Sequence, residues 1–317
     1  MIRNPATERY SALTRIGLVS AVSALAMDED MPPLVEAVRR AGALVETPCW
    51  DDAGVDWSRY DVAVLRSTWN YVDRIDDFLA WARCCARATR LLNTPEVVAW
   101  NTDKHYLVEL ATAGIGVVPT RFVEPGAATA AELQAFLAGG AAAFTVGAAT
   151  EFAEFVIKPS IGAGSRDAAR YRRADAATAH AHLARLVESE RRSAMLQPYL
   201  DHVDLAGETA VVYLGGHSSH AIRKGAILRL GSDLVAGLFA PEQISVRQPQ
   251  RDESLLAARA HAAIPFDAPL YARIDMIRDG RGAPVVLELE LTEPSLFLAQ
   301  APGSADRLAR ALLARCE

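Results

Sequence analysis

The chain has 317 residues, of which 51% are hydrophobic, and carries a net charge of −6. This balance indicates a folded protein with an apolar core and excludes a disordered chain. At this length we expect two or three compact units of about 100 residues each. The acidic charge excludes a general nucleic-acid-binding surface, and no segment approaches the roughly 20 apolar residues that span a membrane. Four cysteines without zinc-ligand spacing indicate reduced thiols in a cytoplasmic protein.

The first part of the chain alternates apolar strands with amphipathic helices. After a loose polar leader (residues 1–14), strands are predicted at 16–23, 44–48, 60–66 and 90–93, and helices at 31–43 and 75–87. This rhythm predicts an open parallel sheet in a unit of residues 1–94. Ligands of such sheets bind beyond the carboxyl ends of the strands. The polar residues expected to contact a substrate there are Ser20, Ser23, Arg66, Ser67, Thr68 and Asn70.

Arg66 is the best candidate in this group to hold a substrate carboxylate, because its guanidinium matches that group with two parallel hydrogen bonds. The alternative is an arginine in a salt bridge between two units of the chain.

The rest of the chain divides into three further stretches. A connecting helix (101–113) lies within a linker, residues 95–118. Residues 119–200 predict a small α+β unit with helices at 130–138 and 174–190 and strands at 155–158 and 194–198. Residues 201–317 predict a hairpin (208–214 and 220–224), a long loop (229–247) and a closing helix (304–314). Loops of that length are often active-site lids.

The most informative segments are two strands rich in charged residues, 271–277 and 285–291. Side chains alternate along a strand, so Arg273 and Asp275 share one face, as do Glu288 and Glu290. Carboxylates gathered in core strands repel one another unless a cation compensates them. Magnesium is the simplest such cation, and it usually also holds nucleotide phosphates. The alternative is an amphipathic edge strand that exposes its glutamates.

Three basic motifs are candidates for contacts with phosphate. Lys158 ends a strand and precedes a loop of small residues, Ser160, Gly162, Gly164 and Ser165, whose backbone can approach phosphate oxygens. This is not the GxxxxGK[ST] pattern, so a P-loop fold is not indicated. Lys104 at a helix start and Arg223-Lys224 at a strand end are the other two motifs. The alternatives are a surface turn, a capped helix and a solvated strand edge.

The order and spacing of these motifs resemble the ATP-grasp superfamily, in particular its glutathione synthetase, ribosomal-protein glutamate ligase and D-alanine–D-alanine ligase branches. The resemblance covers residues from about 15 to 300. It implies an α/β (α+β) fold, in which an N-terminal open parallel-sheet domain precedes two α+β lobes that clasp the nucleotide. Residues 119–200 would then be the mobile small lobe and 201–317 the central lobe with the magnesium site.

The resemblance also implies roles for individual residues. The phosphates of ATP would be bound by Lys104, Lys158 and Lys224, with Arg223 beside the triphosphate, and by the loop 159–165. The adenine would be bound by the backbone of a hinge formed by Gln197, Pro198, Tyr199 and Leu200, and the ribose by Glu208. Two Mg²⁺ ions would be held by Asp275, Glu288 and Glu290, and Arg273 would stabilise the oxyanion of the reaction intermediate. The named branches usually carry Glu-x-Asn at the second metal pair, and this chain carries Glu-x-Glu. A homodimer is common among them.

A narrower resemblance rests on Arg66–Tyr71, Trp100–Lys104, Gly164–Asp167 and Glu288–Ser295. These segments are similar to a bacterial ATP-grasp subgroup that contains the D-cycloserine synthetase acting on O-ureido-D-serine. The resemblance implies an ATP-dependent ligase or cyclase that activates a carboxylate as an acyl phosphate and joins it to a nitrogen nucleophile. Its substrate would be a small amino-acid-like molecule, with Glu293 and Ser295 among the residues that contact it.

Several alternatives stay open at this stage. Glu293 either receives a substrate ammonium or caps a turn before Pro294. The enzyme is either a cyclase or an intermolecular carboxylate–amine ligase, and a small-molecule phosphotransferase or a nucleotide-binding module without catalysis are further candidates.

Overall fold

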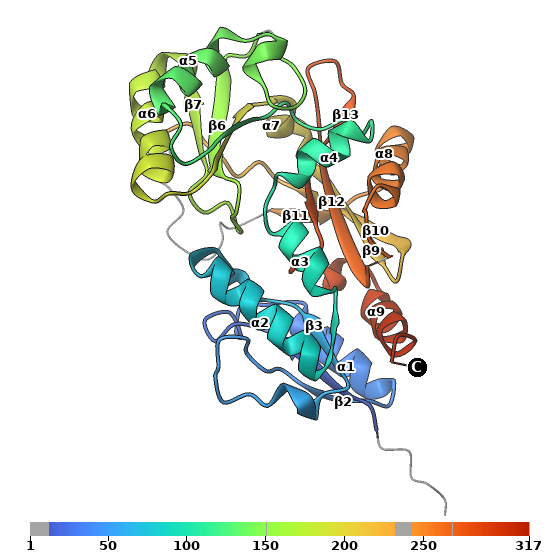
Figure 1. Ribbon diagram of the computed structural model, residues 1–317. Helices are drawn as coiled ribbons and strands as arrows, with labels where there is room; N and C mark the ends of the chain where they lie inside the picture. Colours follow the sequence, from blue (N-terminus) through green and yellow to red (C-terminus); the bar gives the residue numbers. More distant parts are fainter. Residues whose placement is uncertain (1–12, 150, 232–242, 268, 317) are drawn as a thin grey trace, which may run out of the picture.

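The protein is built around three sheets that follow one another along the chain (Figure 1). The computed structural model describes residues 13–149, 151–231, 243–267 and 269–316. Most of the predicted leader and residues 232–242 of the predicted lid loop lie outside the described residues. Within the described part of the chain, none of the helices has the length and apolar content needed to traverse a bilayer.

The first sheet is parallel, as the sequence predicts, with the strand order β2-β1-β3-β4. Its elements are β1 (Arg15–Val19), α1 (Met31–Arg40), β2 (Leu44–Glu46), β3 (Val62–Leu65), α2 (Ile75–Ala88) and β4 (Arg90–Leu92). Alternation along β3 directs Val62 and Val64 toward α1 and Ala63 and Leu65 toward α2. Both faces are therefore covered, which explains the continuously apolar strands.

The linker forms two helices where the sequence predicts one. These are α3 (Pro95–Asn101) and α4 (Tyr106–Thr112). Lys104 lies in the turn between these helices and lines the cleft described below. It is buried, so the alternative of a lysine exposed on a capped helix does not hold.

The second sheet is antiparallel, with the order β5-β8-β6-β7. Its elements are β5 (Arg121–Val123), α5 (Thr129–Ala138), β6 (Glu154–Pro159), β7 (Ala169–Arg172), α6 (Ala176–Ala184) and β8 (Ala194–Pro198). The sequence does not predict β5 and β7, because they are short and carry little apolar alternation. Phe136 of α5 and Leu183 of α6 pack in one apolar cluster with Phe155 of β6.

The third sheet has the order β11-β10-β9-β12-β13. Its elements are α7 (His202–Ala206), β9 (Glu208–Leu214), β10 (His217–Lys224), β11 (Ile244–Val246), α8 (Arg251–Ala262), β12 (Tyr271–Arg278) and β13 (Pro284–Glu290), followed by α9 (Ser304–Leu313). Strand β11 pairs with β10 inside the stretch predicted as a loop, so that prediction is wrong for residues 244–246. Ile274 and Met276 pack with Leu256 of α8, and the opposite face of β12 looks into the cleft.

Gly207 offers a test of how the third sheet positions a lysine. Its φ is +69°, and a Cβ atom there would lie 2.4 Å from the backbone oxygen of Lys224. We predict that Gly207→Ala lowers the free energy of unfolding by about 2 kcal/mol or more, through strain and overlap together. Gly42→Ala is the matched control, because φ is +92° there but no atom lies within 4 Å of the added carbon. Denaturant unfolding of both variants gives the comparison, and equal losses would contradict the overlap with Lys224.

Candidate active site

A cleft of about 350 Å³ lies where the three sheets meet. Most of the predicted nucleotide and metal residues line it, namely Lys104, Lys158, Gly162, Gly164, Ser165, Gln197, Pro198, Tyr199, Leu200, Glu208, Lys224, Arg273, Glu288 and Glu290, together with the predicted substrate residues Glu293 and Ser295. Residues separated by almost two hundred positions thus converge on one cavity.

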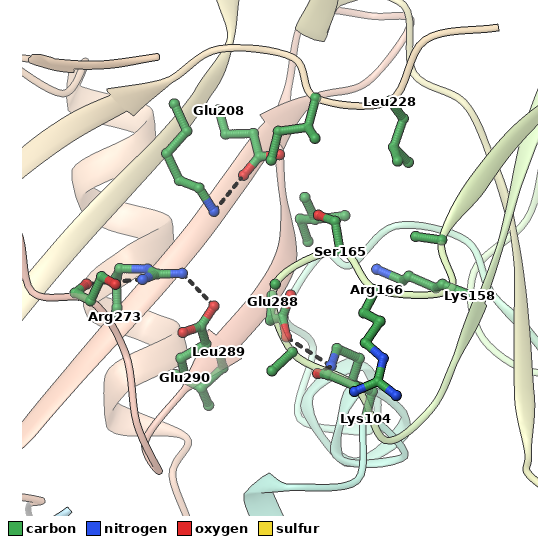
Figure 2. Close-up of a pocket in the computed structure, with 18 of the residues that line it drawn as sticks. Lys104, Lys158, Ser165, Arg166, Glu208, Leu228, Arg273, Glu288, Leu289 and Glu290 are labelled. Carbon is green, nitrogen blue, oxygen red and sulfur yellow. Dashed lines mark hydrogen bonds and ion pairs between the residues drawn. The ribbon is translucent and has the colours of Figure 1, made fainter. Parts of the chain in front are cut away.

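Two paired strands supply the carboxylates of this cleft. Arg273 lies opposite Glu290 and Asp275 opposite Glu288 in the antiparallel register of β12 and β13. Arg273 binds both oxygens of Asp275 at 2.8 Å. It also pairs with Glu290, as Figure 2 shows. Strand β13 is the outermost strand of its sheet, but Val286 bridges to Val117, so its edge is covered. The glutamates therefore face the cleft and not open solvent.

The compensating lysines come from other elements. Lys104 lies 2.9 Å from Glu288 (Figure 2). Lys224 lies 3.1 Å from Asp275 and 3.3 Å from Glu208. Lysine and arginine cations thus reach the carboxylate strands from the linker, from β10 and from β12 itself.

Lys158 differs from the other two lysines. Its backbone pairs with Met195 of β8, but its side chain makes no hydrogen bond or ion pair with the described residues. Figure 2 shows this side chain directed into the cleft near Ser165. Burial lowers the pKa of its amine, although Glu288 opposes that shift. A lysine ammonium in this position favours binding of an anionic ligand, because no carboxylate in the described part of the chain pairs with it directly.

The carboxylates have pKa values that move in opposite directions. Burial alone would raise the pKa of Asp275, but Arg273 and Lys224 lower it below its usual range. Lys104 and Lys158 likewise overcome burial and lower the pKa of Glu288. For Glu290, burial exceeds the attraction of Arg273, and repulsion from Glu288 and Asp275 raises its pKa further. Negative charge is therefore in excess around Glu290.

This excess fits a divalent cation with oxygen ligands. Within the described residues, no group of three or more His, Cys, Asp or Glu side chains is already arranged around a metal position. Both oxygens of Asp275 are bound by cations, and Asp275 is not part of the cleft lining. The geometry thus favours Glu288 and Glu290 as magnesium ligands and does not support direct coordination by Asp275.

Two predicted phosphate contacts lie away from the cleft. Arg223 donates to the backbone oxygens of Ala206 and Leu205, at 2.8 and 3.1 Å, because neighbouring residues of β10 point to opposite faces and Lys224 takes the inner one. The prediction that Arg223 contacts the triphosphate does not agree with this orientation. Ser160 is buried outside the cleft lining, where its carbonyl accepts the backbone N–H of Lys104 at 3.1 Å.

The predicted substrate residues of the first sheet do not line the cleft either. Ser20, Ser67 and Thr68 are fully buried, Ser23 is exposed, and Asn70 binds Asp51 and Trp50. Arg66 is fully buried between Asp28 and Asp30 and donates to the backbone oxygen of Pro294 at 3.2 Å. Asp28 and Asp30 belong to the same N-terminal unit as Arg66, so the salt bridge lies within that unit and does not join two units as the alternative states. The burial of Arg66 outside the cleft lining does not favour direct pairing with a substrate carboxylate, which stays a prediction.

Side chains from two other units fix the segment that follows β13, residues 291–298. The Asp30 carboxylate accepts three backbone N–H groups, from Leu296, Phe297 and Leu298, at 2.5 to 3.0 Å. Asn101 accepts the N–H groups of Leu291 and Thr292 and donates to the oxygen of Leu289. Sequence reasoning missed both roles. Asn101 lay within a recognised motif, but no local pattern gives the position of its partners.

Glu293 occupies the end of the cleft nearest the first sheet. Its backbone oxygen accepts the indole N–H of Trp69 at 3.0 Å, and its carboxyl group contacts the Tyr71 hydroxyl. Burial raises the pKa of Glu293 to about 7, although Tyr71 and Lys104 oppose the shift. A carboxyl group in this setting suits a cationic partner such as an ammonium.

The three sheets, the lysines and the carboxylate pair together define an ATP-grasp ligase, a class of enzymes that use ATP and Mg²⁺. Comparison with known proteins narrows the class. A family profile described as the N-terminal domain of D-cycloserine synthetase DcsG matches residues 16–93. The cycloserine biosynthesis protein DcsG of Streptomyces lavendulae is 39% identical over 305 residues, which are 95% of this chain and 98% of the relative. The chain therefore belongs to the DcsG family of ATP-grasp ligases.

Solved structures agree with this assignment. The crystal structure of D-cycloserine synthetase DcsG is 38% identical, has a TM-score of 0.88, and covers 96% of this chain and 100% of that one. D-alanine–D-alanine ligase of Bacillus anthracis is 14% identical with a TM-score of 0.64, covering 96% of this chain and 97% of the ligase, and shares the fold. The fold and the class predicted from the motifs are confirmed.

The raised pKa of Glu293 predicts a pH-dependent stability. An acid whose pKa is raised on folding stabilises the fold below its unfolded value near 4.5, and this contribution is lost as the pH rises through about 7. Between pH 4 and 7.5, unfolding free energies of the ligand-free wild type should fall by roughly 3 kcal/mol relative to Glu293→Gln. Parallel curves for the two proteins would show that Glu293 ionises normally.

Proposed function

We propose that this enzyme is a D-cycloserine synthetase that closes O-ureido-D-serine into a ring at the expense of ATP. The observation that carries the proposal is the position of Glu293 in the cleft that also holds the carboxylate pair Glu288 and Glu290. A small amino acid with its ammonium on Glu293 would extend its carboxylate toward the metal and phosphate end. The identity of 39% with a cycloserine biosynthesis protein across 95% of the chain supports the same substrate.

The nucleotide would bind along the lysine side of the cleft. Lys104, Lys158 and Lys224 line the cleft and would place three cations around its phosphates, and Gln197–Leu200 would contact the adenine. Two magnesium ions are proposed on Glu288 and Glu290, where they would neutralise phosphate charge during transfer. Without magnesium, Lys104 compensates the negative charge of Glu288, and Lys224 compensates that of Asp275.

The proposed reaction comprises two group transfers followed by a hydrolysis. A substrate carboxylate oxygen attacks the γ-phosphorus of ATP and ADP leaves, giving an acyl phosphate. The oxygen-bound nitrogen of the ureido group then attacks the acyl carbon, inorganic phosphate leaves, and the nitrogen gives up its proton. Water afterwards removes the carbamoyl group as carbamate, which decomposes to carbon dioxide and ammonia. Arg273 is held in the cleft by Asp275 and Glu290 and would stabilise the oxyanion of the second step.

The first test is ADP release from magnesium ATP with O-ureido-D-serine alone, then with amino acids singly and in pairs. We expect ADP, phosphate and a ring product, identified by mass spectrometry, from the ureido compound without any added amine. Turnover that requires a second amino acid would make this an intermolecular ligase instead. A stable phosphorylated product would indicate a phosphotransferase.

The metal assignment predicts the effect of Glu288→Gln. The substitution removes a magnesium ligand and the partner of Lys104 but keeps the side-chain volume. We expect kcat to fall by about 100-fold or more while the thermal midpoint changes little, since loss of one phosphate-neutralising contact costs several kcal/mol in the transition state. Activity within about threefold of wild type at saturating magnesium would refute Glu288 as a ligand.

A further inference from the structure

The loop that follows β6, residues 159–167, is attached to the first sheet's unit as well as to its own lobe. Both guanidinium nitrogens of Arg166 donate to the carboxylate of Asp73, at 2.8 and 2.6 Å. Ile161 packs against the apolar cluster of the N-terminal unit, which includes Trp69 and Val72. We call residues 159–167 the phosphate loop, because Gly162, Gly164 and Ser165 line the cleft.

The end of the phosphate loop is also fastened to the second sheet's lobe. Asp167 has a φ of +57° and binds Arg185 and Arg192, each at 2.8 Å. Arg192 donates in addition to the backbone oxygen of Ile161 at 3.2 Å. Arg166 therefore projects from a braced backbone, so a movement of the lobe is transmitted to its contact with Asp73.

Asp73 belongs to a short 3-10 turn that also reaches the substrate end of the cleft. This turn, η2 (Trp69–Asp73), carries Trp69, which binds the backbone of Glu293, and Tyr71, which contacts the Glu293 carboxyl group. This five-residue turn thus contacts the phosphate loop through Asp73. Through Trp69 and Tyr71 it contacts Glu293, the residue predicted to bind the substrate.

We propose that the Arg166–Asp73 pair is a clamp that couples closure of the phosphate loop to the substrate end of the cleft, with Arg166 as a positioning residue. When the phosphate loop closes on the nucleotide, Arg166 holds η2, and η2 holds Glu293. By linkage, a substrate on Glu293 then strengthens closure over the nucleotide by the same factor. The clamp itself requires only the ATP-grasp class, whereas its effect on substrate rests on the proposed function.

The strength expected of the clamp is modest. The side chains of Arg166 and Asp73 are 29% and 50% exposed, so solvent screens them, although the two parallel hydrogen bonds favour a defined geometry. We therefore expect loss of the pair to raise the equilibrium constant for loop opening by a factor of about five, which is not an all-or-none effect. A clamp of this strength still releases product when the nucleotide leaves.

Limited trypsin digestion tests the clamp without any substrate. Lys158 precedes a proline and resists cleavage, so Arg166 is the first cleavable site in the phosphate loop. With magnesium and a non-hydrolysable ATP analogue, Asp73→Asn should be cut after Arg166 about fivefold faster than wild type, measured by mass spectrometry of the fragments. Asp73→Glu keeps the charge and should cleave at close to the wild-type rate.

Asp306→Asn is the matched control, because it breaks another ion pair between two units, Arg40 of α1 with Asp306 of α9 at 2.7 Å, which includes no residue of the phosphate loop or of η2. It should leave the cleavage rate at Arg166 unchanged. If Asp73→Asn lowers the thermal midpoint, Arg166→Lys replaces it, since it keeps a cleavable cation but loses the forked contact. Cleavage of both variants at the wild-type rate would overturn the clamp.

The second arm measures coupling between the two ligands. The dissociation constant of the ATP analogue is determined with and without O-ureido-D-serine, and the ratio should be about fivefold smaller in Asp73→Asn than in wild type. An unchanged ratio would overturn the coupling. If the ureido compound does not bind the wild type, the proposed substrate is wrong, and trypsin cleavage alone then decides for or against the clamp.

Discussion

The structure depends on a balance of buried charge in one cleft. Two neighbouring strands contribute the carboxylates, including Glu288 and Glu290, and cations arrive from the linker, β6, β10 and β12. A buried charge without a partner is costly. The sheets must therefore meet at this place for any of these side chains to be tolerated. The excess negative charge that remains around Glu290 is what prepares the cleft for a divalent cation.

The first sheet's unit acts mainly as a support for the segment after β13. Asp30 holds three consecutive backbone N–H groups of that segment, and Arg66 holds the oxygen of Pro294. Such a segment has no secondary structure of its own to satisfy its backbone, so side chains from elsewhere must do it. Glu293 and Ser295 gain fixed positions in the cleft in this way, which is what their proposed role in orienting a small substrate would require.

Prediction from the sequence succeeded where the pattern was local and failed where partners were distant. The apolar strands and amphipathic helices of the first sheet were recognised, because their periodicity is strong. The short strands β5, β7 and β11 were not, because pairing and not composition creates them. Arg223 was placed in the cleft, although only the pleat of β10 decides that Lys224 points inward.

The sequence by itself determined the carboxylate hairpin, the lysine that ends β6 and the order of the motifs, since these follow from alternation and spacing along one strand or loop. Only the tertiary structure decided that Arg66 is buried and paired with Asp30, and that Arg166 meets Asp73. The physical reason is that burial and charge pairing depend on which segments meet across the cleft, and spacing along the chain does not encode that meeting.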